Sequence, residues 1–362
     1  MSTRSPSAAR WCRSSGLHRV DMRWFDDLGR PVQDDAILHR LRSLAIPPGW
    51  HDVWADTDPE ARVQATGVDA RGRTQYRYSA AAAAEATARK FADLLQFGGS
   101  LPTLRTHVER HLTEGVGEDS PSRVRRATAA TVRLLDRGLF RVGSPRYARD
   151  NHTYGLTTLT REHVRLDGDE IEFEFIGKEH RPWHVTVRDG QVAEVIRMLV
   201  ASSSSATAPL FSVRTPEGEH AITSAVVNAY VHGATSAPAT AKTFRTWGGT
   251  AAAAAVAGGA TAPFAARSTR PDLVAVEVAA YLLGNTRDVA RRSYVHPLAF
   301  EAGRSPAVVE AIDAAARASG SSDVRELLRA DAVVLALAAE LARITASPPE
   351  SPASPASPAP PR

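Results

Sequence analysis

The spacing of apolar and polar residues divides the chain into two zones. Up to about residue 81, apolar residues recur with a period of two, which is the period of half-buried strands. Arg19 to Trp24 alternates in this way, and His51 to Trp54 is a second short run. Arg62 to Asp69 and Thr74 to Tyr78 are two extended runs joined by a glycine-containing turn, which predicts a hairpin. We expect one helix in this zone, at Asp34 to Leu44.

Beyond about residue 82 the pattern is mainly helical, with Ala-rich stretches separated by Gly, Pro and Ser. The exception is Val164 to Val187, where alternation is interrupted by the turn pairs Asp167-Gly168 and Gly177-Lys178. This segment predicts a three-stranded antiparallel meander. Helices are expected at 81–97, 102–113, 122–138, 191–201, 221–232, 240–258, 272–283, 286–294, 306–318 and 322–344.

The fold class that follows is α+β. A small β-rich N-terminal domain, at 17–90, precedes a larger, mainly helical domain with one embedded antiparallel sheet, at 91–345. Residues 1–16 are rich in Ser, Arg and Ala, and residues 346–362 repeat Ser, Pro and Ala. Because such segments cannot bury a core, we expect both ends of the chain to be disordered.

Composition limits the classes of function. The chain of 362 residues has 44 basic and 40 acidic residues, so its net charge of +4 favours a polyanionic partner only weakly. Cys12 is the single cysteine, which argues against disulfides and cysteine-rich zinc sites. No apolar run reaches the roughly 18 residues of a membrane span. We expect a soluble, cytoplasmic protein that does not bind membranes.

The basic residues are unusual in kind, because 41 are arginines and only three are lysines. Where arginine serves almost everywhere as the surface cation, the remaining lysines are candidates for positions at which a guanidinium would fail. A lysine can release a proton during a reaction, whereas an arginine cannot. Lys178 and Lys242 are the two lysines that lie in segments with other candidate chemistry.

One group of residues suits attack on a phosphodiester. Tyr294 offers a phenol that can become a covalent nucleophile, and Arg141 and Arg245 offer planar forks of donors to phosphate oxygens. Lys178 is a candidate acid for the leaving oxygen, and Asn285 has an amide donor. Taken singly, each is more often an ordinary surface, turn or cap residue. Their combination is the specific signal.

Several motifs, in this order and at this spacing, resemble the type IB DNA topoisomerases of the poxvirus and bacterial group, from about residue 17 to 340. The motifs are Ile46-Pro-Pro-Gly-Trp-His-Asp-Val-Trp54, Asp69-Ala-Arg-Gly-Arg-Thr-Gln-Tyr-Arg-Tyr78, Arg141-Val-Gly, Gly155-Leu-Thr-Thr-Leu159, Phe175-Ile-Gly-Lys178, Lys242-Thr-Phe-Arg245-Thr-Trp-Gly and Arg291-Arg-Ser-Tyr294.

The resemblance implies a tyrosine recombinase/topoisomerase IB-like catalytic domain that relaxes supercoiled DNA. It implies Tyr294 as the nucleophile that forms a 3′-phosphotyrosyl link, and Arg141 and Arg245 as clamps on the transition state. Lys178 would be the general acid on the 5′ oxygen, supported by Lys242. No cofactor, ATP or metal ion is expected.

The same resemblance implies a monomer that binds double-stranded DNA and is associated with the nucleoid. Gln75, Tyr76 and Tyr78 match positions that contact DNA from the N-terminal domain, and Tyr147 matches a contact in the catalytic domain. The chain departs from the family pattern at Asn285, where a histidine is usual, and at Glu179, where an aspartate is common. An asparagine can replace a hydrogen-bond donor but not an acid or base.

Two other functions remain open from the sequence. Tyrosine recombinases use the same phosphotyrosyl chemistry, but they have a histidine at the position of Lys242 and a helical N-terminal domain. The second alternative is a DNA-binding homologue that has lost catalysis. The full set of tyrosine, clamps and acid argues against that loss.

Overall fold

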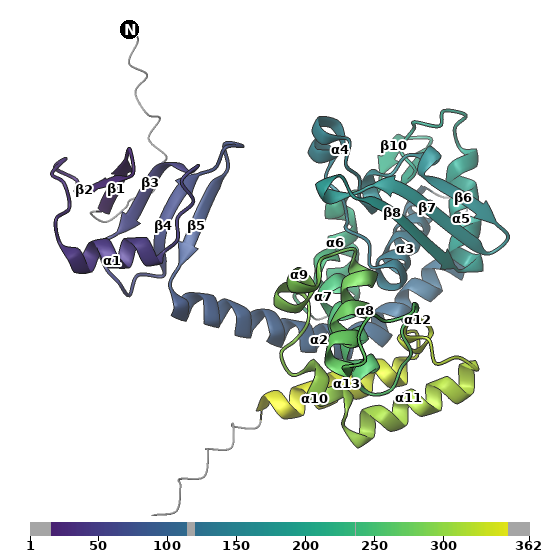
Figure 1. Cartoon of the computed structure of the whole chain (residues 1–362). Coiled ribbons are helices and arrows are strands. Elements are labelled where there is room, and N and C mark those ends of the chain that lie inside the picture. Colours follow the sequence, from purple (N-terminus) through teal and green to yellow (C-terminus); the bar gives the residue numbers. More distant parts are fainter. Residues whose placement is uncertain (1–15, 114–119, 236, 347–362) are drawn as a thin grey trace, which may run out of the picture. The chain divides into compact units, whose positions relative to one another are not determined.

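The computed structural model describes residues 16–113, 120–235 and 237–346, and the chain divides into two compact units after Lys90 (Figure 1). The first unit is a small β-rich domain and the second is larger and mainly helical, which confirms the α+β class. The predicted disorder at the two ends falls on 1–15 and 347–362, outside the described residues. Gly16 and Ala346, which we assigned to those ends, belong to β1 (Gly16–Val20) and α13 (Asp331–Ala346).

The first unit is a five-stranded antiparallel sheet with one helix, α1 (Asp35–Ser43), against it. Leu41 of α1 packs with Leu17, Ala55 and Ala65 of the sheet. Asp34 caps the helix by accepting from two backbone N–H groups. In spatial order the strands are β2 (Arg23–Phe25), β1 (Gly16–Val20), β3 (His51–Asp56), β4 (Val63–Val68) and β5 (Thr74–Tyr78).

The alternating run from Arg19 to Trp24 is two strands rather than one. Asp21 and Met22 adopt positive φ angles of 47° and 65°, and they form the two-residue turn between β1 and β2. Such turns favour Gly, Asn or Asp. Asp21 fits this preference, but Met22 stands where Gly is usual, so the local signal for this reversal was weak.

The second unit contains the predicted meander of β6 (Val164–Asp167), β7 (Glu170–Ile176) and β8 (Pro182–Arg188), in the order β6-β7-β8. The helices surround α7 (Ala241–Ala257), which is buried along most of its length. The others are α2 (Ala80–Thr113), α3 (Ser120–Gly138), α4 (Pro145–Asn151), α5 (Gly190–Ala201), α6 (Ser224–Ala234), α8 (Pro271–Leu283), α9 (Arg287–Ser293), α10 (Ala299–Gly303), α11 (Pro306–Ser319) and α12 (Val324–Leu327), besides α13.

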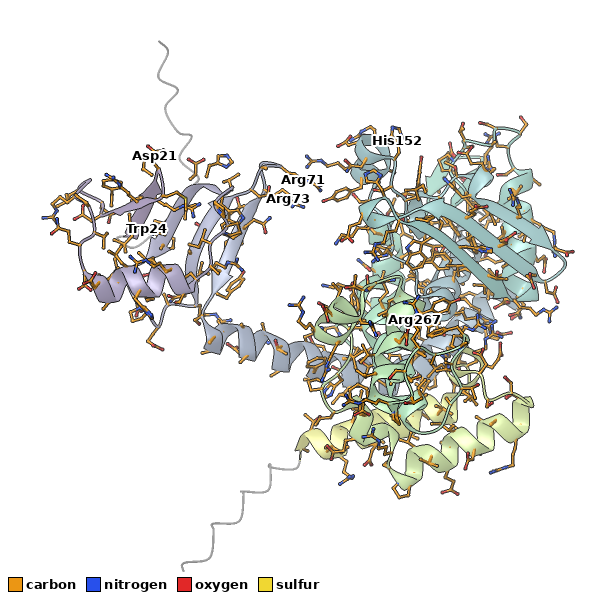
Figure 2. All side chains as sticks on the ribbon, in the orientation of Figure 1. Asp21, Trp24, Arg71, Arg73, His152 and Arg267 are labelled. Atoms are coloured by element: carbon orange, nitrogen blue, oxygen red, sulfur yellow. The ribbon has the colours of Figure 1, made fainter. Side chains whose placement is uncertain are left out.

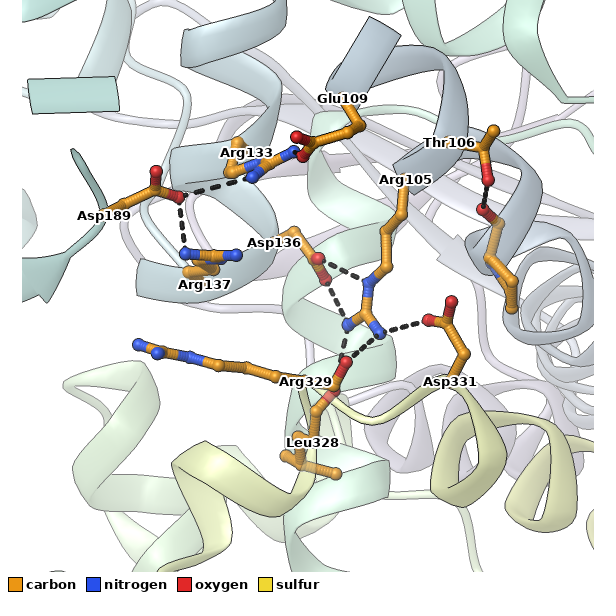
Figure 3. A network of polar contacts seen from close by, with 11 residues as sticks. Arg105, Thr106, Glu109, Arg133, Asp136, Arg137, Asp189, Leu328, Arg329 and Asp331 are labelled. Carbon is orange, nitrogen blue, oxygen red and sulfur yellow. Dashed lines mark hydrogen bonds and ion pairs between the residues drawn. The ribbon is translucent and has the colours of Figure 1, made fainter. Parts of the chain in front are cut away.

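Three of the predicted helices were wrong in their boundaries. Residues 81–97 and 102–113 form one helix, α2, which continues through Pro102. Burial of Leu101 and Leu104 on one side of α2 offsets the roughly 3 kcal/mol cost of an internal proline. Residues 322–344 are instead two helices, because Arg105 of α2 donates to the carbonyls of Leu328 and Arg329 at the break (Figure 3).

Some elements carried no clear signal in the sequence. The short helices α4 and α10 were not predicted, nor was the hairpin of β9 (Ser212–Thr215) and β10 (Gly218–Ala221). This hairpin displaces the start of α6 to Ser224, three residues beyond the predicted position. No helix within the described ranges is both long and apolar enough to cross a lipid bilayer.

Candidate active site

Tyr294 lies directly after the last residue of α9, and α7 holds its backbone. The Tyr294 carbonyl accepts a hydrogen bond of 2.9 Å from Oγ1 of Thr250, and this Thr250 hydroxyl in turn accepts a hydrogen bond from the His296 N–H. Gly249 permits this approach, since a Cβ at that position would lie 3.2 Å from the Tyr294 Cβ and 2.9 Å from Leu283. The backbone and Cβ of Tyr294 are therefore held against α7, which is buried along most of its length.

Arg245 lies on α7 beside this tyrosine and is almost completely buried, at 3% exposure. Its guanidinium donates from Nη1 to the Leu139 carbonyl and from Nη2 to the Leu283 carbonyl, the latter at 2.8 Å. Its charged carbon lies 5.3 Å from the centre of the Tyr294 ring. These carbonyls end α3 and α8, so two helix ends hold the guanidinium against the phenol.

Arg141 lies in the loop after α3 and donates from Nη2 to the side-chain oxygen of Asn285 at 2.6 Å. A guanidinium has no acceptor, so the Asn285 atom that faces it must be the oxygen. The amide nitrogen of Asn285 consequently points the other way. The structure thus brings together Arg141, Arg245, Asn285 and Tyr294, from the loop after α3, from α7 and from the two ends of α9.

Trp183 of β8 lies beneath both arginines. The centre of its ring is 5.4 Å from the Arg141 guanidinium and 5.8 Å from that of Arg245, within the range of cation–π contacts. Gly284 is required beside it, because this residue has a φ of +56° and a Cβ would lie 2.5 Å from the indole. We did not identify Trp183 from the sequence. Its only signal was an inward position on the predicted meander, opposite Phe175.

Two donors in this cluster are buried and unused. Nε of Arg245 and Nδ2 of Asn285 have no hydrogen-bond partner among the described residues. Buried hydrogen-bond donors in native proteins nearly always have an acceptor. Two donors without an acceptor, both close to one phenol, therefore need an explanation. The hydrogen-bond partners of Arg141 and Arg245 are an amide, backbone carbonyls and, for Arg245, the Tyr294 side chain. None of these partners is a carboxylate, although the charge of Glu179 acts on Arg141. An anion with several acceptor oxygens would satisfy both the donors and the charge.

The electrostatics of the cluster favour ionisation of the phenol. Burial raises the pKa of Tyr294, but the charges of Arg245, Arg141 and Lys242 outweigh it and hold the pKa below its usual value. Burial, reinforced by the nearby charge of Arg141, lowers the pKa of Arg245 to about 10, so this residue stays charged at neutral pH. Burial also lowers the pKa of Arg141.

The two candidate lysines lie differently. Lys242 is exposed in the first turn of α7, where its charge still acts on Tyr294. Lys178 begins the 3-10 turn η3 (Lys178–His180) at the tip between β7 and β8, with 69% of its side chain exposed. Its ammonium lies 3.9 Å from the carboxylate of Glu179. The described contacts do not join Lys178 to the phenol.

In the first unit, Tyr76 and Tyr78 lie on one face of β5 and stack with ring centres 6.0 Å apart. Their exposures are 43% and 55%, so neither ring packs into the core. Gln75, on the opposite face, donates to Asp69 at 3.0 Å. Asp69 also pairs with Arg73, at the tip of the β4–β5 hairpin, and that arginine lowers the Asp69 pKa to about 2 (Figure 2).

Tyr147 belongs to the second unit. It lies on α4 and is exposed at 41%. The helix ends at His152, which adopts a left-handed conformation with φ of 50° (Figure 2).

Comparison with known proteins adds to this geometry. Residues 79–299 match the family model described as eukaryotic DNA topoisomerase I, catalytic core, and residues 21–69 match that of the bacterial DNA topoisomerase IB N-terminal domain. The DNA topoisomerase 1B of Acanthamoeba polyphaga mimivirus is 31% identical over 163 residues, which is 45% of this chain and 47% of the relative. The DNA topoisomerase 1B of Vaccinia virus (strain Copenhagen) is 27% identical over 155 residues, or 41% and 48%. The chain thus spans about half the length of the curated relatives it matches.

Proposed function

Because the chain belongs to the type IB DNA topoisomerase family, we propose that it relaxes supercoiled double-stranded DNA by cutting and resealing one strand. This makes it an isomerase of DNA topology. The observation that carries the proposal is the pair of buried, unpaired donors on Arg245 and Asn285, beside a tyrosine whose pKa is lowered. A backbone phosphate is the group that would satisfy these donors while presenting its phosphorus to the phenol.

In the cleavage step, the Tyr294 oxygen attacks phosphorus and forms a phosphotyrosyl bond with the 3′ end of the strand. The bond from phosphorus to the 5′ oxygen breaks. Charge grows on the non-bridging oxygens, where Arg141, Arg245 and the amide of Asn285 donate hydrogen bonds. Preorganised donors of this kind typically contribute about 10²–10³ each in rate. Because hydrogen bonds to other protein groups already orient the guanidinium groups of Arg141 and Arg245, these side chains need little reorientation when the substrate binds.

The 5′ oxygen leaves as a hydroxyl after Lys178 gives it a proton, since an alkoxide is a poor leaving group. Lys178 reaches the phosphate from the tip of the β7–β8 hairpin, where its side chain is free to extend. Lys242 assists by lowering the pKa of Tyr294. Reversal of the same steps reseals the strand, because the phosphotyrosyl bond conserves the energy of the broken one. Rotation of the duplex before resealing removes supercoils, with no need for ATP.

We further propose that the helical unit has the arrangement shared with tyrosine recombinases, and that the protein acts as a monomer on the nucleoid in the cytoplasm. Duplex DNA is contacted from the first unit by Gln75, Tyr76 and Tyr78, and from the second by Tyr147. The exposure of the three tyrosine rings supports this assignment. Glu179 keeps the carboxylate beside Lys178 and helps to orient its ammonium, at 3.9 Å.

The test is relaxation of supercoiled plasmid in EDTA and without ATP, by the wild-type protein and by Tyr294→Phe. We expect relaxation and a detergent-trapped covalent adduct with the wild type, and neither with the variant. The variant keeps the ring, so an unchanged melting temperature controls for folding. DNA binding without relaxation would favour the non-catalytic homologue, and strand exchange between two duplexes would favour a recombinase.

A further inference from the structure

Trp183 of β8 lies against the two arginines that flank Tyr294, and it does so from a buried position, since the residue is only 7% exposed. The centre of its ring is 5.4 Å from the Arg141 guanidinium and 5.8 Å from that of Arg245. An indole offers one N–H donor and no acceptor. The reaction proposed above therefore gives this ring no step of its own, and its place beside both arginines needs another reason.

The indole also packs against two glycines that adjoin the proposed site. A Cβ at Gly177 would lie 2.8 Å from Cδ1 of Trp183, and a Cβ at Gly284 would lie 2.5 Å from its Cζ2. Gly177 directly precedes Lys178, and Gly284 directly precedes Asn285. The ring is thus in contact with the backbone of both segments that carry these candidate side chains.

Aromatic packing sets the plane of the indole. Phe175, which pairs with Trp183 across β7 and β8, stacks on it with ring centres 5.9 Å apart and an angle of 22° between the planes. The ring of Phe140, next to Arg141 in sequence, lies 6.4 Å away at 30°. Both phenylalanines are buried. The orientation of the indole is therefore fixed by the core of the protein itself.

The two arginines differ in how firmly other groups hold them. Arg245 donates to two backbone carbonyls and is hydrogen bonded to the Tyr294 side chain. Among the described residues, the Arg141 guanidinium donates one hydrogen bond, to Asn285. Arg141 also lies on a loop rather than on a helix. Because the face of an indole attracts a cation, Trp183 supplies a second restraint on Arg141, where Arg245 already has three.

We propose that Trp183 is a positioning residue that holds the Arg141 guanidinium in place for the phosphate. The inference rests on the proposed function, because that function assigns Arg141 to a phosphate oxygen. The indole face and the hydrogen bond to Asn285 together restrain the guanidinium. Without the indole, Arg141 keeps only the hydrogen bond and spends less time in the position that suits the phosphate.

The structural part of the proposal is tested without DNA, by modifying arginines with phenylglyoxal and mapping each peptide by mass spectrometry. In Trp183→Leu, Arg141 should react about threefold faster or more than in the wild type. Trp183→Phe keeps an aromatic face and should react close to the wild-type rate. Arg126 and Arg161, at 6% and 8% exposure, report general loosening of the fold and should not change.

Three results overturn the proposal. They are an unchanged rate at Arg141 in Trp183→Leu, equal rates at Arg141 in the leucine and phenylalanine variants, and an equal rise at Arg126 and Arg161.

A second variant displaces the indole without removing it. Gly177 has a φ of −93°, which an alanine adopts without strain, but its Cβ would force the Trp183 ring to shift. Arg141 should again react faster in Gly177→Ala, with Arg126 and Arg161 unchanged. This variant decides the question if Trp183→Leu does not fold, and an unchanged Arg141 rate in it contradicts the proposal.

The catalytic part is tested by single-turnover cleavage in a double-mutant cycle. Trp183→Leu should slow cleavage about tenfold when Arg141 is present, and by less than about twofold in the Arg141→Ala background. The matched control is Phe173→Leu, which removes a buried aromatic ring from the neighbouring strand and should have the same effect in both backgrounds.

Equal slowing by Trp183→Leu in the two backgrounds would refute the positioning role. A wild type that does not cleave DNA would instead refute the proposed function, and the modification rates would still decide whether Trp183 holds Arg141.

Discussion

Arg245 and Lys178 are both proposed to act on the same phosphate, yet their surroundings are opposite. Arg245 is 3% exposed on the central helix and donates to carbonyls from two other helix ends. Lys178 is 69% exposed at a hairpin tip, with its ammonium 3.9 Å from the adjacent carboxylate of Glu179. The proposed charge clamp Arg245 is built into the core, whereas the proposed proton donor is on a turn.

The difference has a chemical reason. A charge clamp works best when its dipoles are already oriented, because reorientation during the reaction costs free energy. A proton donor must approach the leaving oxygen and then accept the proton back during resealing. A flexible four-carbon stem with a single charged nitrogen suits that movement, and a lysine can lose its proton where an arginine cannot. Structure and chemistry therefore assign arginine and lysine to different places.

The largest effect is expected for Arg245→Ala, which should impair both catalysis and stability. The cleavage rate should fall about 10³-fold, because a preorganised donor is lost. The carbonyls of Leu139 and Leu283 would also lose their donor, which costs about 1–3 kcal/mol each. Single-turnover cleavage and urea unfolding measure the two quantities. An unchanged unfolding midpoint would show that the buried guanidinium does not hold the two helix ends.

Lys178→Ala should impair catalysis without affecting stability. We expect a 10²–10³-fold loss of cleavage, as for a general acid, with stability changed by less than about 0.5 kcal/mol at this exposed position. A substrate with sulfur at the 5′-bridging position needs no proton to leave, so it should restore the rate. The matched control is Arg165→Ala on the same sheet. It should change the cleavage rate of neither the ordinary substrate nor the sulfur-containing one. Failure of the sulfur substrate to rescue Lys178→Ala would place the acid elsewhere.

Asn285→Ala should slow cleavage about 100-fold, because one donor to the phosphate is lost and Arg141 loses its partner. Asn285→Asp keeps the acceptor for Arg141 but lacks the N–H group, so it should be impaired to a similar extent. A loss of less than about threefold in Asn285→Ala would remove this residue from the site. The pH–rate profile of the wild type should contain no limb that belongs to an imidazole at this position.

The smallest effect concerns pH. Cations near Tyr294 lower its pKa, so the phenolate forms at lower pH and the cleavage rate rises with pH until that pKa is passed. Removing one cation in Lys242→Gln should raise the Tyr294 pKa and move this rising limb to higher pH, with a several-fold slower rate below it. With the sulfur-containing substrate, the leaving group needs no proton, so the pH profile reports the ionisation of the phenol alone. An unshifted limb would mean that Lys242 does not act on the tyrosine.

The sequence predicted some parts of the fold better than others. The β6-β7-β8 meander was predicted correctly, because alternation and two turn signals agreed. The course of α2 through Pro102 and the break between α12 and α13 were predicted wrongly. In both, a contact distant in sequence prevailed over local propensity: burial of Leu101 and Leu104 in one, and the carbonyls bound by Arg105 in the other.

By itself the sequence determined which residue types are available and in what order, and these are what predicted the candidate site. It named Tyr294, Arg141, Arg245, Asn285 and Lys178 as a group. Only the tertiary structure decided that Trp183 lies beneath the arginines, and that Asn285 turns its oxygen to Arg141 and its nitrogen away. Those are facts of side-chain orientation between distant segments. Packing and hydrogen bonding across the folded core set them, and no local pattern encodes that geometry.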